Sequence, residues 1–211
     1  MEAKLSKETA LQKLIAKGII KEEADLRKIN KSGDTPLHTA VRRNDEETMD
    51  LILAVDPSLA IIENFHQHTP IATAIIHCKR KAVAKMLKAY PNIIKDENGK
   101  PWCDSTGRHV LHYLAKYADE KDPNFISVFK ASPKEVFTMK DGESNTLTHI
   151  AARWGKINLL GLFARKTPET LCMKGMYDLT PGELAQKFGD NATYIFADYL
   201  KRKYVKQPKL K

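Results

Sequence analysis

The sequence predicts an all-α solenoid, in which helix-turn-helix units stack in a row and are joined by loops with β-turn fingers. The first observation is a short motif whose first residue recurs at intervals of 34, 40, 37 and 34 residues, at Thr35, Thr69, His109, Thr146 and Thr180. The second is a proline after four of the predicted second helices, at Pro57, Pro91, Pro133 and Pro168. A period of this length marks a repeat architecture, because each unit buries its apolar face only against its neighbours.

The motif has a physical reason at each position of its best copy. Gly33 allows a tight turn with positive φ, and the hydroxyl of Thr35 can cap the following helix. Pro36 then occupies the first helical position, where a missing N–H costs nothing. Leu37 and Ala40 fall on one helical face, and the small alanine lets neighbouring helices approach.

Residues 1–29 precede the first unit and are predicted to form a pair of capping helices. Ser6 can cap a helix that runs through Lys17, and Gly18 stops it. A second short helix is predicted over residues 21–28. Such a pair would shield the apolar side of the first repeat.

Five units follow, at about residues 30–63, 64–103, 104–140, 141–174 and 175–204. Each contains an inner and an outer predicted helix, at residues 36–43 and 46–55, 70–78 and 81–90, 108–117 and 123–130, 146–154 and 157–165, and 181–188 and 192–204. The prolines disfavour helix at the residue before them and so end the outer helices. We expect an extra helical turn after Pro57 and after Pro168.

The motif Thr35-Pro36-Leu37-His38 with Ala40 resembles the ankyrin repeat, whose signature is T-P-L-H-x-A. The resemblance covers about residues 30–204. The third unit departs from it with His109 and Val110 in place of Thr and Pro, and the fifth has lost the His and Leu. The family's usual Gly-Ala-Asp ending is absent, so the turns should differ locally from the consensus.

About six extra residues, within 95–104, separate the second and third units, and they include Trp102 and Cys103. Insertions in repeat proteins map to loops, often on the binding face. The alternative is a tolerated surface loop with Trp102 folded back on the stack.

Composition and charge narrow the function classes. The net charge is +9 over 211 residues, but residues 201–211 hold six cations and no acid, which leaves +3 for the body. The basic tail, residues 205–211, is read as a solvated terminus or as a nuclear-import, nucleic-acid or anionic-membrane patch. No stretch is long and apolar enough for a membrane helix, and the N-terminus lacks the apolar region of a signal peptide. Three scattered cysteines indicate neither disulfides nor zinc, so we expect a reducing, intracellular setting, cytoplasmic or nuclear.

The resemblance implies a concave binding face made of inner-helix residues and loop tips. Carried over by position, the inner-helix pairs are Arg42 and Arg43, Ile76 and His77, Lys116 and Tyr117, Arg153 and Trp154, and Lys187 and Phe188. The tips and the insertion add Phe65, His66, His68, Trp102, Arg108 and Tyr177. Cations beside aromatic rings suit an acidic segment with apolar anchors. The alternative is that Tyr117, Trp154 and Phe188 pack between units.

The sequence offers little sign of catalysis, metal binding or a cofactor. His38, His112 and His149 occupy the motif position at which the family's imidazole hydrogen-bonds backbone between loops. A thiol–imidazole pair of Cys103 with His109 or His112 lacks a third group. There is no phosphate loop, nucleophile elbow or H-E-x-x-H.

The leading hypothesis is therefore a non-enzymatic, monomeric adaptor that binds another protein. Two alternatives stay open. One is an ankyrin effector that an intracellular bacterium delivers into the host cytosol. The other is binding to nucleic acid or anionic membrane through the tail and Arg42, Arg43, Arg108 and Arg153, although the charge of the body is too small to predict a nucleic-acid surface.

Overall fold

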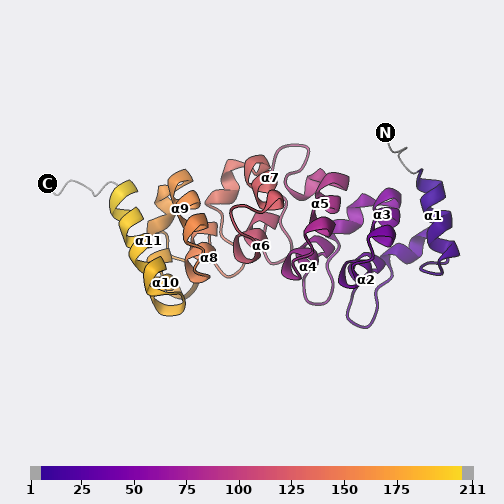
Figure 1. Ribbon diagram of the computed structural model, residues 1–211, viewed down its shortest axis with the longest axis horizontal. Coiled ribbons are helices and arrows are strands. Elements are labelled where there is room, and N and C mark those ends of the chain that lie inside the picture. Colours follow the sequence, from indigo (N-terminus) through magenta and orange to yellow (C-terminus); the bar gives the residue numbers. More distant parts are fainter. Residues whose placement is uncertain (1–5, 206–211) are drawn as a thin grey trace. The chain divides into compact units, whose positions relative to one another are not determined.

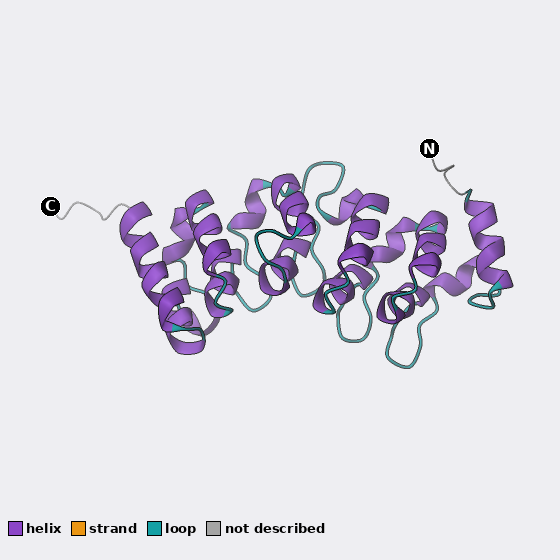
Figure 2. Cartoon of the chain, in the orientation of Figure 1, coloured by secondary structure: helices purple, strands orange, loops and turns teal. Residues whose placement is uncertain are grey.

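The computed structural model describes residues 6–205 (Figure 1). Over these residues it is built from helices and loops without a β-strand, which confirms the all-α prediction (Figure 2). The chain divides into two compact units, residues 1–98 and 99–211, and the division falls inside the predicted insertion. The finer division into a capping pair, five repeats and a tail stays a prediction, and residues 206–211 of that tail lie outside the described part.

The first unit contains the first two predicted helix hairpins and the helix that precedes them. Its α-helices are α1 (Lys7–Ala16), α2 (Pro36–Arg43), α3 (Glu46–Val55), α4 (Pro70–Ile76) and α5 (Arg80–Ala89). The inner helices α2 and α4 pack on each other, as do the outer helices α3 and α5. Helix α1 packs on α3 and buries Leu14 completely, so it covers the open side of the first hairpin.

One predicted helix of this unit is shorter than expected. The segment predicted as a helix over residues 21–28 is a single 3₁₀ turn, η1 (Glu23–Arg27). The side chain of Asp25 accepts hydrogen bonds from the N–H groups of Lys21 and Glu22, at 2.6 and 3.1 Å. These two residues therefore form the cap of the turn and cannot belong to a helix.

The second unit contains three more hairpins. Its α-helices are α6 (Val110–Tyr117), α7 (Pro123–Ala131), α8 (Leu147–Arg153), α9 (Ile157–Lys166), α10 (Pro181–Phe188) and α11 (Asn191–Tyr204). The inner helices form one row, in which α8 packs between α6 and α10, and the outer helix α9 packs against α11. Within residues 6–205, none of the helices has the length and apolar character needed to cross a membrane.

Prolines set the ends of the outer helices, as predicted. A 3₁₀ turn follows at four places, in η2 (Pro57–Ile61), η3 (Pro91–Ile93), η4 (Lys134–Phe137) and η5 (Pro168–Cys172). The predicted extra turns after Pro57 and Pro168 are thus confirmed. The short turns bury Leu59, Val136 and Phe137 under the outer helices, so they replace the family's usual loop with additional core.

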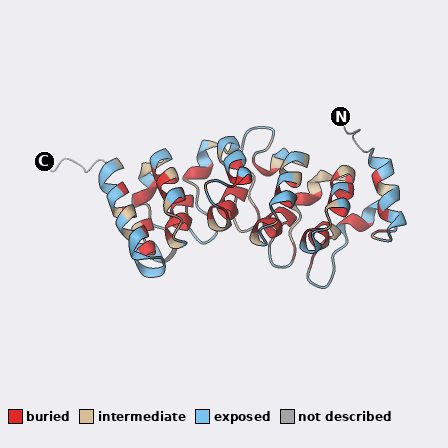
Figure 3. Ribbon diagram, in the orientation of Figure 1, coloured by how far each residue is buried: buried red, intermediate tan, exposed pale blue. Residues whose placement is uncertain are grey.

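Each unit has its core between its inner and outer helices (Figure 3). Small residues at the motif alanine position, Ala40, Ala74 and Ala151, are 0 to 3% exposed, which permits close approach of neighbouring inner helices. The second unit adds an aromatic cluster of Phe125, Phe129, Phe137 and Phe163, whose ring centroids lie 5.2 to 6.5 Å apart. Aromatic pairs at these separations add to the free energy of burial.

The loop before each inner helix is a finger closed by the same backbone bonds. In the first finger, the Asn30 N–H donates to the Asp34 carbonyl at 3.0 Å and the Gly33 N–H donates to the Asn30 carbonyl at 2.9 Å. The residue two places before the helix cap has positive φ in all five fingers, at Gly33, Gln67, Gly107, Ser144 and Asp178. The expected β-turn fingers are therefore present, and glycine is dispensable at three of them.

Candidate protein-interaction surface

The predicted site residues lie at the C-terminal ends of the inner helices and on the fingers. They belong to both units, and each unit is described by itself. In the first unit, Arg42 and Arg43 end α2, and His77 caps the end of α4. In the second unit, three pairs end α6, α8 and α10 in the same way, namely Lys116 with Tyr117, Arg153 with Trp154, and Lys187 with Phe188.

Arg42 is held in place by the first finger and by the C-terminal end of α4. Its Nε donates to Asp34 Oδ2 at 3.0 Å, and its Nη1 lies 3.2 Å from His77 Nε2. Asp34 is buried and also accepts from the Asn64 amide at 2.7 Å. Burial opposes ionisation of Asp34, but the bonds from Arg42 and Asn64 outweigh it and lower its pKa. The guanidinium of Arg42 is thus already bonded to Asp34 and His77, so Arg42 has a structural role and is not a free cation.

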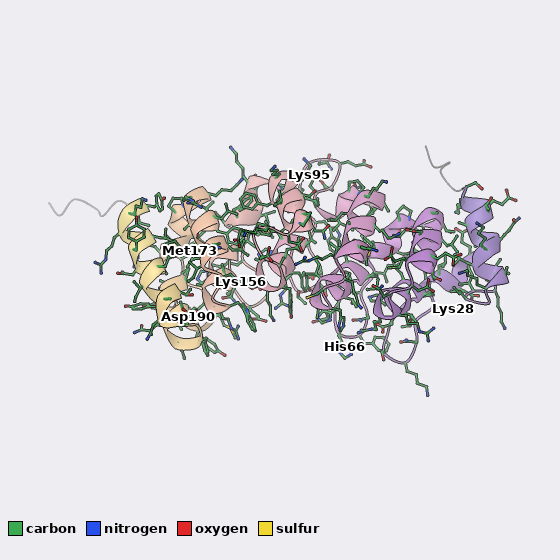
Figure 4. The ribbon with its side chains drawn as sticks, viewed as in Figure 1. Lys28, His66, Lys95, Lys156, Met173 and Asp190 are labelled. Carbon is green, nitrogen blue, oxygen red and sulfur yellow. The ribbon has the colours of Figure 1, made fainter. Side chains whose placement is uncertain are left out.

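The second finger presents the aromatic residues predicted for its tip. Phe65 is 67% exposed, and its ring lies against Gly33 of the first finger. His66 is exposed at the end of the finger (Figure 4), and its ring centroid is 6.5 Å from that of the half-buried His68. The carbonyl of His68 is bonded to His38, so this residue is partly structural.

The second unit brings seven of the predicted residues into one continuous series, which we call the cation–aromatic ladder: Tyr117, Lys116, Trp154, Arg153, Phe188, Lys187 and Tyr177. Each cation lies over two rings. Lys116 Nζ is 4.9 Å from the centroid of Tyr117 and 4.3 Å from that of Trp154. The guanidinium of Arg153 is 5.8 Å from Trp154 and 5.5 Å from Phe188. Lys187 Nζ is 5.3 Å from Phe188 and 4.9 Å from Tyr177.

The rings of the ladder remain open to solvent. Trp154 is 47% exposed, Tyr177 58% and Phe188 43%, while Tyr117 is half-buried. Full packing between repeats would bury rings of this size, so the alternative that Tyr117, Trp154 and Phe188 pack between repeats does not describe Trp154 or Phe188, whereas it fits the half-buried Tyr117. Cations within about 6 Å of a ring centroid attract it, by about 0.5–1 kcal/mol at exposed sites. These contacts therefore favour this arrangement of the ladder in the free protein.

Arg108 and Arg153 share a carboxylate that belongs to the chain itself. Glu143, at the tip of the fourth finger, receives Arg108 Nη2 on Oε1 at 2.5 Å and Arg153 Nη1 on Oε2 at 3.4 Å. Arg108 also bonds to the buried Asp141 through Nε at 3.3 Å. Both oxygens of an exposed carboxylate are therefore taken by two different guanidinium groups.

The fifth finger reaches the ladder through a strained backbone. Tyr177 and Asp178 have φ of 60° and 59°, two consecutive left-handed residues without a glycine. Such conformations cost on the order of 1 kcal/mol each and concentrate at functional sites. Their effect is to set the Tyr177 ring 5.6 Å from that of Phe188, next to Lys187.

Three predicted residues belong neither to the contacts of Arg42 and the second finger nor to the cation–aromatic ladder. Arg43 is exposed at the end of α2, Ile76 is half-buried in the last turn of α4, and Trp102 is half-buried in the insertion. The partial burial of Trp102 favours the alternative in which its ring folds back on the protein.

The motif histidines are structural at two of three positions. The Nε2 atom of His38 lies 2.9 Å from the His68 carbonyl, and that of His149 lies 3.0 Å from the Met173 carbonyl. Nδ1 of both rings accepts from a backbone N–H of the helix cap, which fixes the neutral tautomer with hydrogen on Nε2. His112 departs from the expectation, because its buried Nε2 has no hydrogen-bond partner of normal geometry among residues 6–205.

Burial keeps these imidazoles neutral. Desolvation lowers the pKa of His112 and of His149 to about 4, although nearby carbonyls act in the opposite direction. Burial and the neighbouring Asp104 raise the pKa of the Cys103 thiol to about 11, so Cys103 stays protonated and is a poor nucleophile. Among the residues described, no group of three or more His, Cys, Asp or Glu side chains could hold a metal ion.

Sequence reasoning missed the acidic partners of this surface. Asp34, Asp141 and Glu143 orient the arginines, yet they carry no motif of their own. One signal was present: Asn30, Asn64, Asp104 and Asp141 all stand five residues before a helix cap. Each side chain accepts from two N–H groups of its finger, as Asp141 does from Glu143 and Asn145 at 3.0 and 2.9 Å.

Comparisons with known proteins agree with this geometry. Residues 2–98 match the family model described as ankyrin repeats (3 copies). Residues 2–98, within the first compact unit, therefore carry ankyrin repeats. Ankyrin repeats are generally protein–protein interaction modules and are typically not enzymes.

A solved structure with the same fold covers both units. It is the complex of the predatory endopeptidase Bd0816 from Bdellovibrio bacteriovorus with the immunity protein Bd3460. The match covers 94% of this chain and 99% of the matched chain, with a TM-score of 0.67 and 17% sequence identity. The likeness shows the fold alone. Among curated proteins, no relative of this sequence is found.

Proposed function

We propose that this protein is a non-enzymatic adaptor whose cation–aromatic ladder captures an acidic segment of a partner protein. The observation that carries the proposal is the alternation of exposed rings and cations along α6, α8 and α10. Aromatic and arginine side chains most often dominate interface energies. Ring faces can hold apolar anchors of a partner while the cations between them receive its carboxylates.

Preorganisation supports this use of the surface. The cation–π contacts restrain long side chains that would otherwise lose rotamer freedom on binding. Among residues 6–205, no carboxylate partner is found for Lys116 or Lys187. These two cations therefore retain the capacity to pair with an acidic guest.

The partner can be an enzyme as readily as a regulatory protein. The similar fold in a complex of an endopeptidase with an immunity protein motivates including proteases among the candidates. Free thiols at Cys78 and Cys172, both exposed, support our proposal of a reducing, intracellular setting, because such thiols oxidise in secreted proteins.

A pull-down from cell lysate tests the proposal. Replacing Arg153 and Trp154 by Ala should weaken partner binding by roughly 2–4 kcal/mol. The helical signal should persist and stability should fall by about 1 kcal/mol or less, because both side chains are at least partly exposed. Proteins that wild type retains and the double variant loses are identified by mass spectrometry.

The second unit offers a matched control. Tyr199 and Lys203 form another cation–aromatic pair, at 5.4 Å, on α11 outside the ladder. The Tyr199→Ala, Lys203→Ala variant should retain every partner. Equal losses from both variants, or a collapse in stability of the first, would contradict a binding role for the ladder.

A further inference from the structure

The spacing of the ladder says more about the guest than its charge does. Each of the three cations stands seven residues after the first motif residue of its repeat: Lys116 after His109, Arg153 after Thr146 and Lys187 after Thr180. They therefore occupy the same place on three successive inner helices. Helix α8 packs directly against α6 and α10. Packed helices lie about 8–10 Å apart, so the three cations repeat at roughly that interval.

An extended peptide advances about 3.3 Å per residue, and a polyproline II segment about 3.1 Å. Three residues therefore span about 9–10 Å, which is the step between neighbouring inner helices. Polyproline II also has three residues per turn, so side chains at i, i+3 and i+6 point the same way. An α-helix advances only 1.5 Å per residue, so carboxylates about 8 Å apart along it would be five or six residues apart. Residues at that separation lie on different faces of the helix and could not all point toward the ladder.

Resting on the proposed function, we infer that the ladder reads a partner segment in the polyproline II conformation with one carboxylate at every third residue. The carboxylates pair with the three cations in turn, and apolar residues between them lie on the exposed rings of Trp154 and Phe188. Exposed rings between cations could also stack on the bases of a nucleic acid. However, residues 1–200 carry a net charge of only +3, which is small for a surface that binds a polyphosphate backbone. Charge complementarity therefore favours an acidic peptide over a nucleic acid.

Glu143 shows how one of these carboxylates is held. It is bound by Arg108 and Arg153 although it is exposed and belongs to the same chain. The central cation of the series, Arg153, thus already donates to a carboxylate while it keeps its two ring contacts. A guest carboxylate arriving at this position would take the place of Glu143.

Two isomeric peptides test the spacing. One is four repeats of Glu-Pro-Leu, and the other has the same twelve residues with glutamate at alternate positions. Binding of each fluorescein-labelled peptide is measured by fluorescence anisotropy at low ionic strength. We expect the three-residue spacing to bind about tenfold more tightly, because only it can place three of its four carboxylates on the three successive cations.

Two triple variants identify the surface responsible. Replacing Lys116, Arg153 and Lys187 by Ala should abolish the preference, while replacing Lys121, Lys130 and Lys134, exposed cations outside the ladder, should preserve it. Circular dichroism and melting confirm that each variant is folded. Should the ladder variant fail to fold, Lys116→Ala with Lys187→Ala provides the same comparison.

Each result decides a different question. Equal affinities for the two peptides, both reduced in the ladder variant, would overturn the spacing and leave the proposed function standing. Equal losses in both triple variants would show attraction by net charge alone and overturn the inference. Binding of neither peptide would also overturn it, while the lysate pull-down decides separately whether the ladder captures a protein.

Discussion

Two buried imidazoles link the ankyrin motif to the acid stability of the protein. His112 and His149 have pKa values lowered by burial to about 4, compared with 6.5 in an unfolded chain. Between these values the unfolded state binds protons that the folded state does not, so stability is lost as pH falls from 6.5 to about 4. Carboxyl groups with lowered pKa values, such as Asp34 and Asp45, add their loss only below about 4.

We therefore expect the free energy of unfolding to fall by about 3 kcal/mol for each of the two histidines over this window. Urea titrations at pH 7, 6, 5 and 4.5 measure the change. His149→Asn should flatten part of the slope, whereas His66→Asn, at an exposed fingertip, should leave it unchanged. A stability that is constant from pH 7 to 4.5 would show that the buried rings titrate normally.

The role of Glu143 can be tested separately from the roles of Arg108 and Arg153. If it competes with a guest carboxylate for Arg108 and Arg153, Glu143→Gln should tighten binding of an acidic peptide by roughly three- to tenfold. Fluorescence anisotropy with the Glu-Pro-Leu peptide measures this. Glu135→Gln removes an exposed carboxylate from η4, away from the ladder, and provides the control. Weaker binding by Glu143→Gln would mean that Glu143 positions Arg153 and does not compete.

At the scale of elements, the fingers depend on backbone conformation more than on side-chain burial. Four fingers use an Asn or Asp side chain to bind their own N–H groups. The fifth has Gly175 at that position, and an added Cβ there would lie 2.5 Å from the His149 ring. The acceptor is therefore excluded sterically, and the fifth finger instead carries the left-handed pair Tyr177 and Asp178.

Gly33 and Gly18 form a matched pair for testing the finger. Both have positive φ, at 77° and 67°, but a Cβ on Gly33 would lie 2.5 Å from the Phe65 backbone nitrogen, while nothing lies within 4 Å of one on Gly18. Gly18→Ala should cost about 1 kcal/mol from the left-handed conformation alone. Gly33→Ala should cost at least about 2 kcal/mol, because the second finger must also move. Equal losses by urea denaturation would show that the fingers are not packed against each other.

At the scale of the whole molecule, the chain consists of two compact units, and the ladder belongs entirely to the second. The basic tail follows α11 in the sequence, and the last turn of α11 already contains Lys201, Arg202 and Lys203. Deleting residues 206–211 leaves this helix intact and should change partner affinity by less than about twofold, with weak salt dependence. A tenfold loss, or an affinity that falls steeply with salt, would favour the nucleic-acid or membrane alternative. Pull-downs at two ionic strengths with the deletion variant distinguish these outcomes.

The sequence was sufficient for those parts of the fold that local interactions determine. Helix starts at Thr35, Thr69 and Thr180 follow from a hydroxyl cap and a proline, and the ends of the outer helices follow from the next proline. Periodicity predicts a longer helix in place of the 3₁₀ turn at Glu23–Arg27, because it does not reveal that the side chain of Asp25 competes for the backbone N–H groups. The division within residues 95–104 was visible only as an insertion.

The candidate surface was predictable in its residues but not in its contacts. The residues seven and eight places after the first motif residue of a repeat include Lys116, Arg153 and Lys187 with their neighbouring rings. Repeat geometry fixes where these positions lie on each inner helix. Which cation lies over which ring depends on side-chain conformations across two helices. The engagement of Arg42 by Asp34, and of Arg153 by Glu143, could not be foreseen, since both acids lie on fingers eight and ten residues upstream.

The coverage of the exposed rings by lysine and arginine also affects how copies of this protein meet one another. Bare aromatic patches promote self-association, because two such faces bury apolar area when they touch. Here each ring is flanked by positive charge, so two identical faces repel before they can come into contact. The same arrangement attracts an acidic partner protein and disfavours contact with a second copy of this chain. This agrees with the prediction that the protein is monomeric in the absence of its partner.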